Sequence, residues 1–79
     1  MRKNVKVIGI GSRRNGTSKA GNEYDFTPVA LAFPEDGYNG FRAETCNVDT
    51  ALISGVEVGQ QLDVVFHFQN YKMVIDAVL

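Results

Sequence analysis

Cysteine, histidine and tryptophan are scarce, because the 79-residue chain has one cysteine, one histidine and no tryptophan. Cys46 alone excludes an intramolecular disulfide framework and fits a reducing cytoplasm. One cysteine and one histidine do not supply the usual ligand set of a zinc site. No apolar run approaches the ~18 residues that span a bilayer, and Met1-Arg2-Lys3 leads into no signal-type core. We therefore expect a soluble cytoplasmic protein that needs no membrane, metal or cofactor.

Catalytic groups are equally sparse. Cys46 and His67 form the one possible thiol–imidazole pair, and no orienting third group or oxyanion site accompanies them. Residues 11–18 have the glycine spacing of a phosphate-binding loop, but Thr17 stands where the lysine is required and no long helix follows. The sequence therefore predicts no enzymatic activity and no small-molecule substrate.

The length of the chain indicates a single domain over residues 1–79. The apolar fraction of 44% is typical of a globular protein. A chain this short lies near the lower size at which one core folds unaided, so a second subunit covering apolar surface favours folding. We expect a homodimer.

The charges are unevenly distributed along the chain. The formal net charge is −1, yet residues 1–22 carry six basic and no acidic side chains, and the remainder carries −7. Such asymmetry is typical of a protein with a polyanion-binding face. The alternative is that these are ordinary solvated charges on an edge strand and its loop.

Alternation of apolar and polar residues predicts an all-β fold. A closed or partly open five-stranded antiparallel barrel is the economical arrangement, because closure removes sheet edges. Gly-rich segments at 12–22 and 34–40 are predicted to be connections, the first a loop or irregular hairpin tip. Residues 49–54 are predicted to form one helical turn, capped by Asp49. The expected strands cover residues 3–11, 23–33, 41–48, 62–69 and 72–79.

Within these strands the pattern predicts several local features. Val5 and Val7 differ in parity from Ile8 and Ile10, which indicates a bulge near Ile8. Pro28 indicates an edge position or a bulge, because proline cannot donate to a ladder. Cys46 and Val48 are predicted to turn inward, and Phe68 to share the inward face of Leu62, Val64 and Phe66.

The most informative stretch runs from residue 13 to residue 26. Single-stranded nucleic acid suits a cationic loop beside strand-borne rings, because cations follow its phosphates while rings stack on its bases. We therefore predict phosphate contacts by Arg13, Arg14 and Lys19 and stacking by Tyr24 and Phe26. For both rings the alternative is burial in the core.

Residues 16–26, Gly-Thr-Ser-Lys-Ala-Gly-Asn-Glu-Tyr-Asp-Phe, resemble the DNA-binding loop of filamentous-phage single-stranded DNA-binding proteins. In that family an arginine, a small basic tip, a glycine, a tyrosine and an apolar residue two places on form a hairpin wing. Residues 62–72 and 74–79 are similar to the family's last two strands. The resemblance covers about half of the chain.

The resemblance implies an OB-fold-like barrel with a protruding wing, a symmetric homodimer, and cooperative, sequence-tolerant coating of single-stranded DNA during phage replication in the bacterial cytoplasm. It matches Arg13 or Arg14 to the phosphate-contacting arginine, Lys19 to the basic tip, Tyr24 to the stacking tyrosine and Phe26 to its apolar neighbour. This chain departs from the family by placing Glu23 and Asp25 beside Tyr24.

Four further residues, Tyr38, Phe41, Arg42 and Tyr71, are weaker candidates for DNA binding. The three rings are candidates because of their position in or beside turns, and contact with a second subunit is the alternative for them. Arg42 lies on the polar face of a strand, where an ordinary surface charge is the simpler interpretation. Two other functions remain open: single-stranded RNA binding with translational repression, and a small β-barrel that binds another protein.

Overall fold

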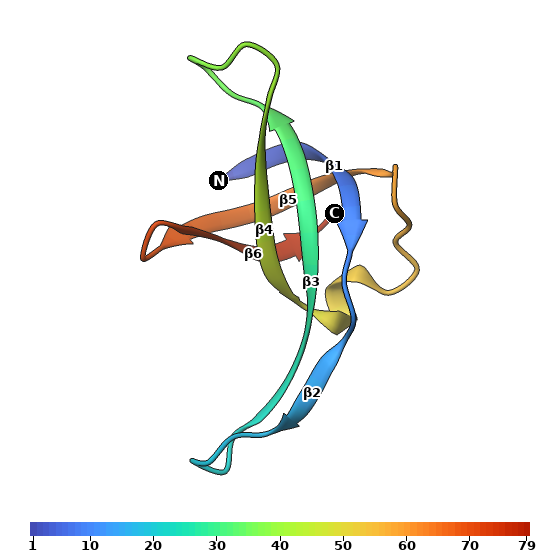
Figure 1. The fold of residues 1–79 in the computed structure, drawn as a ribbon, viewed down its shortest axis with the longest axis vertical. Coiled ribbons are helices and arrows are strands. Elements are labelled where there is room, and N and C mark those ends of the chain that lie inside the picture. The colour runs from blue at the N-terminus through green and yellow to red at the C-terminus, as the bar shows by residue number, and fades with distance from the viewer.

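The chain forms six antiparallel strands and one short 3-10 turn, and the computed structural model describes all residues from 1 to 79 (Figure 1). The all-β prediction is confirmed. The five predicted strands are present, and residues 14–17, read from the pattern as a loop or irregular hairpin tip, form a sixth, short strand that is one arm of the hairpin implied by the resemblance. The elements are β1 (Arg2–Ile10), β2 (Arg14–Thr17), β3 (Glu23–Pro34), β4 (Phe41–Asp49), η1 (Thr50–Ile53), β5 (Gln61–Gln69) and β6 (Lys72–Val78).

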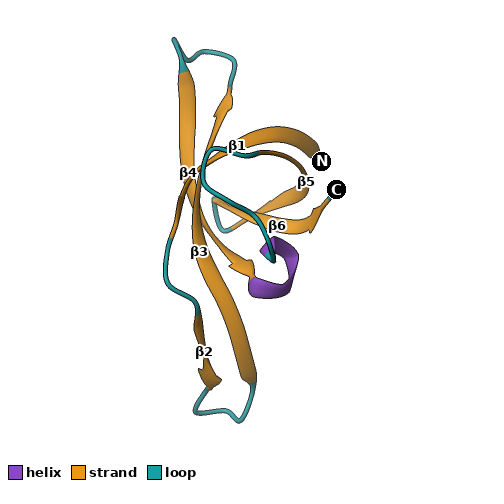
Figure 2. Ribbon diagram, turned by 90° about the vertical axis from the view of Figure 1, so that its right-hand side faces the viewer, coloured by secondary structure: helices purple, strands orange, loops and turns teal.

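All six strands belong to one sheet, in which β3 is the organising strand. The order is β2-β3-β1-β5-β6, and β4 pairs with the other edge of β3. No hydrogen-bonded ladder joins β4 to β6, although the two strands lie close together, so the sheet is open. Figure 2 shows β1, β5 and β6 curving to one side of the long β3–β4 ladder.

The core lies on the inner face of this curved sheet. Alternate residues of each long strand point inward, as the period of two requires. Phe33, Leu31 and Val7 are at most 2% exposed. The inward turn predicted for Cys46 and Val48 is confirmed, since both are buried. The thirteen core residues are Val5, Val7, Val29, Leu31, Phe33, Cys46, Val48, Ile53, Leu62, Val64, Phe66, Met73 and Ile75.

The predicted bulge in β1 is confirmed. For Pro28, where an edge position and a bulge were both predicted, there is no bulge, and one edge of the residue has no partner in a ladder. The register of β1 against β3 shifts between Val7 and Gly9, which leaves Ile8 exposed. Pro28 lies in an unbroken ladder between β3 and β4. On the other edge of β3 the neighbour changes at this point from β1 to β2. Proline is tolerated because it falls between these two ladders, where its carbonyl accepts from the Gly11 amide at 2.7 Å.

Phe68 alternates in phase with Leu62, Val64 and Phe66 along β5 but does not join the core. Phe68 is 44% exposed, because β5 continues past the end of the core before it turns. Its ring contacts Phe66 edge-on, at 5.6 Å between centroids, and the Arg42 guanidinium lies 5.9 Å from its centre.

The helical turn after β4 begins as predicted at Asp49, whose carboxylate accepts from the Ala51 amide at 3.1 Å. The η1 turn buries Ile53 in the core, and Thr50 shares a hydrogen bond of 2.9 Å with Thr27 of β3. It is the one helical element, and no helix of the structure has the length and apolar character needed to cross a bilayer.

Candidate nucleic-acid interface

A two-stranded hairpin, here called the wing (residues 14–26), projects from the rest of the sheet (Figure 1). It consists of β2, the first part of β3 and a five-residue tip between them. The tip is closed by a hydrogen bond of 2.8 Å from the Ser18 amide to the Asn22 carbonyl oxygen. Gly21 allows the turn, because its φ of +85° is unfavourable for other residues. The chain exposes 5533 Å², whereas a typical monomer of this mass exposes about 4,700 Å². The projecting shape therefore leaves much surface for a ligand.

One face of the wing carries the aromatic pair and an arginine. Arg14 lies directly opposite Phe26, and Gly16 lies directly opposite Tyr24. Directly opposed residues share a face of an antiparallel ladder, so these four positions lie together. The two rings are 5.9 Å apart between centroids, with planes tilted by 35°. Tyr24 is 44% exposed, and Phe26 is partly buried without joining the core.

The opposite face of the wing carries the acidic residues. Because side chains alternate along β3, Glu23 and Asp25 point away from the Tyr24 face. Arg13 binds Asp25 through two hydrogen bonds of 2.8 and 2.6 Å. This pairing, with a smaller contribution from Thr50, lowers the pKa of Asp25. The carboxylates beside Tyr24 in the sequence are therefore not beside its ring in space.

The basic side chains between residues 13 and 19 differ in whether an acidic partner already pairs with them. Arg13 is engaged by Asp25 at the base of the wing, whereas Arg14 and Lys19 are exposed and form no ion pair. Arg14 shares the face of the two rings, and Lys19 lies in the tip. Two cations and two rings are consequently free to meet a ligand at this hairpin.

The base of the wing is fixed to the body of the sheet. The Arg13–Asp25 pair and the Thr27–Thr50 hydrogen bond both line an open cavity of about 440 Å³ between the wing and η1. Ile10 and Ile53 supply its apolar wall. These contacts set the direction in which the wing leaves the sheet.

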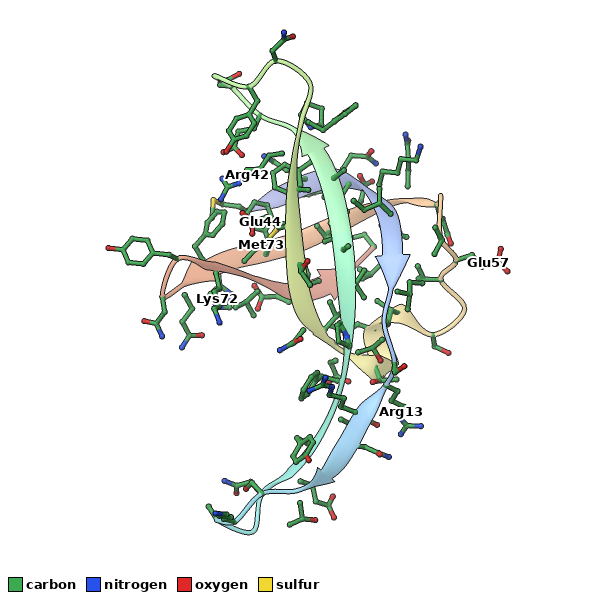
Figure 3. The ribbon with its side chains drawn as sticks, in the orientation of Figure 1. Arg13, Arg42, Glu44, Glu57, Lys72 and Met73 are labelled. Atoms are coloured by element: carbon green, nitrogen blue, oxygen red, sulfur yellow. The ribbon has the colours of Figure 1, made fainter.

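Arg42 lies at the other end of β3, far from the wing in Figure 3. Its guanidinium binds both carboxylate oxygens of Glu35 at 2.9 Å and Glu44 at 2.8 Å. Its other neighbour is the Phe68 ring. Arg42 therefore joins the β3–β4 loop, β4 and β5, and its charge is already matched by two carboxylates.

The remaining predicted rings are exposed and separate from the wing. Tyr38 and Phe41 are 54% and 69% exposed, and they lie at the β3–β4 connection, at the opposite end of β3. Tyr71 is fully exposed in the two-residue turn between β5 and β6, where φ is 52° at Asn70 and 63° at Tyr71. The structure brings Arg14, Tyr24 and Phe26 together and does not bring these three rings to them.

The sequence assigned no role to two residues of the wing. Asp25 is the partner of Arg13, and Gly16 is the residue over which the Tyr24 ring lies. Both follow from the hairpin register, which places Gly16 opposite Tyr24 around a tip centred on Ala20. Reading residues 14–17 as a strand instead of a loop would have revealed them.

Comparison of the chain with protein-family models, with curated proteins and with solved structures gives no match.

Proposed function

We propose that this protein binds single-stranded DNA without catalysis, through the face of the wing that carries Arg14, Tyr24 and Phe26. The main support is that the aromatic and acidic side chains lie on opposite faces of the hairpin. Rings and an unpaired arginine share one face, and the acidic side chains occupy the other, where Arg13 binds one of them. A base stacks on Tyr24 while Arg14 and Lys19 hold phosphates on either side.

A net charge of −1 disfavours binding of a polyanion, and the placement of the wing's acidic residues on the face away from Tyr24 supports binding in spite of it. A DNA strand on the Tyr24 face is not repelled at close range by Glu23 or Asp25, because both side chains project from the other face of the wing. Stacking and phosphate contact do not depend on base identity, so binding tolerates most sequences.

We further propose that the curved sheet is a partly open barrel of the OB-fold kind. In the strand order β4-β3-β1-β5-β6, the two terminal strands come close to each other, as they do when a five-stranded barrel closes. Together with the resemblance of residues 16–26, this supports a role like that of phage single-stranded DNA-binding proteins, which coat DNA cooperatively as homodimers during replication.

The direct test uses tyrosine fluorescence, which no tryptophan obscures. The chain has three tyrosines, so the Tyr38→Phe/Tyr71→Phe variant reports from Tyr24 alone. Titration with oligo(dT) should quench this emission, and affinity should fall as salt rises. The matched control, Tyr24→Phe/Tyr71→Phe, reports from Tyr38. Absence of binding at low salt, or affinity unchanged by several-fold more salt, would exclude the proposal.

Two further measurements define the ligand and the assembly. Competition between oligo(dT) and oligo(U) of equal length separates DNA from RNA as the preferred strand, since only RNA carries the 2′-hydroxyl. Sedimentation at micromolar concentration should give a dimer. A clean monomer at that concentration contradicts the proposed homodimer but not the binding by the wing.

A further inference from the structure

The Tyr24 ring occupies the space above Gly16 on the facing strand. A Cβ atom built on residue 16 would lie 2.9 Å from the Tyr24 hydroxyl oxygen and 3.2 Å from Cζ. The first distance is shorter than real Cβ contacts, so a side chain at this position and the ring in its present place exclude each other.

The backbone at Gly16 does not itself require glycine. The residue lies within β2 and its φ is not positive, whereas Gly21 in the tip has a φ of +85°. Glycine inside a strand is unfavourable by roughly 0.5–1 kcal/mol relative to alanine. The space that it leaves for the ring is therefore what glycine contributes at residue 16.

The ring is also limited on a second side. Phe26, two residues along the same strand, lies 5.9 Å away between centroids. Tyr24 nevertheless remains 44% exposed, so contacts on two sides leave a large part of the ring open. A side chain already confined in this way loses little conformational freedom when a base stacks on it.

We propose that Gly16 is a positioning residue, which leaves the space that the Tyr24 ring occupies in the orientation that receives a base. This inference rests on the proposed function for its consequence in DNA binding. The positioning itself is a property of the free protein and is measurable without DNA.

The first test is made on the free protein by NMR. The Tyr24 ring current should shift the Gly16 Hα resonances away from ordinary strand values, and Tyr24→Leu should abolish this shift. In Gly16→Ala, the Tyr24 ring resonances should move. Gly9→Ala is the matched control, because a Cβ at Gly9 would meet only the Ala30 Cβ at 3.6 Å, an ordinary contact. Unchanged Tyr24 ring resonances in Gly16→Ala would overturn the proposal.

The second test is affinity for oligo(dT). Displacing the ring from this orientation should weaken binding by roughly three- to tenfold in Gly16→Ala, and Gly9→Ala should bind as the parent does. In the Tyr24→Ala background the same Gly16→Ala change should have no further effect, because no ring remains to be positioned.

The outcomes separate this inference from the function on which it rests. If Tyr24→Ala loses affinity and Gly16→Ala does not, the positioning role is wrong and the binding face stands. If Gly16→Ala weakens binding equally with and without Tyr24, Gly16 acts by another route and the inference is also wrong. If no variant changes affinity, stacking on Tyr24 itself is wrong.

Discussion

The wing and the β5–β6 hairpin each present a tyrosine, but they hold it in opposite ways. In the wing, the ring of Tyr24 lies over Gly16 and beside Phe26, within a regular ladder. In the β5–β6 hairpin, Tyr71 itself forms the turn, with a φ of 63°, and its side chain is fully exposed. The first ring is confined by its neighbours, whereas the second has a constrained backbone and a free side chain.

The difference bears on what each ring contributes to binding. A confined ring is ready for a base and keeps most of the stacking free energy. A free ring loses rotamer freedom when it is bound, at about 0.5–1.5 kcal/mol for an immobilised side chain. Exposure alone, which is greater for Tyr71, is therefore a poor guide to the stronger site.

The largest expected effect contrasts the two rings directly. Tyr24→Ala should weaken oligo(dT) binding by roughly 1–3 kcal/mol, the usual contribution of one stacked base, and Tyr71→Ala should weaken it less. Affinities are measured by fluorescence anisotropy of labelled DNA, with folding checked by circular dichroism. A greater loss for Tyr71→Ala would reverse the comparison and place the main stacking site on the β5–β6 hairpin.

The next effect concerns stability. Two consecutive residues with positive φ form a type I′ turn, which favours glycine at its second position. A left-handed backbone conformation costs a bulky residue about 1–2 kcal/mol in the folded state, and glycine removes this cost. Glycine also raises the conformational entropy of the unfolded chain, which offsets about 0.4–1 kcal/mol of the gain in stability. Tyr71→Gly should therefore stabilise the protein by roughly 0.5–1 kcal/mol and raise Tm by about 2–8 °C.

Thermal unfolding measures this change, and Gln69→Gly, adjacent in the same hairpin but within β5, is the control that should not stabilise. A lower Tm for Tyr71→Gly would mean that the ring makes a stabilising contact, for instance with a second subunit.

A smaller effect separates the two adjacent arginines. Each phosphate neutralised on a single strand adds about 0.7 to the slope of log affinity against log salt. Arg14→Ala should lower the slope by this amount, and Arg13→Ala should lower it less, because Arg13 is engaged by Asp25. Asp25→Asn should raise the slope by releasing Arg13. Equal slopes for the two alanine variants would show that the Arg13–Asp25 pair opens on binding.

The smallest expected effect is that of pH. The pKa of Asp25 is lowered below its ordinary value of 3.8, so its pairing with Arg13 is complete above that pH and is lost only as pH falls through the lower, folded value. Between pH 5 and 8 this pair should leave DNA affinity constant, measured at fixed ionic strength. A change in affinity in that range that disappears in Asp25→Asn would contradict the assignment.

Alternation and composition predicted most of the fold. The boundaries of β4, β5 and β6 lie within one residue of those expected, and the Asp49 cap and the β1 bulge follow from local rules. Alternation did not predict a strand at β2, because Arg-Asn-Gly-Thr has no apolar period and forms a strand only by pairing with β3; the hairpin was expected from the resemblance alone. At Pro28 the pattern left an edge position and a bulge open, because the neighbours of a residue in a sheet depend on the other strands.

The sequence predicted which residues belong to the candidate site but not which face of the wing each one occupies. The sequence placed Arg13, Arg14 and Tyr24 near one another, and it left open which arginine was free. Adjacent residues on a strand face opposite ways, so the register of a four-residue strand decides that Arg13 meets Asp25 and Arg14 meets the rings. A shift of one residue would exchange their roles.

The open seam between β4 and β6 bears on where the sheet opens locally. The strands β1 and β5 and the part of β3 outside the wing have neighbours on both sides, so most of their amides are expected to open only with the global unfolding of the sheet. Each of β4 and β6 is hydrogen-bonded along a single edge, and so is β2 of the wing, whose four residues are all exposed. Local opening is therefore expected at this seam and at the wing, so the geometry of the wing rests on the Arg13–Asp25 and Thr27–Thr50 contacts at its base.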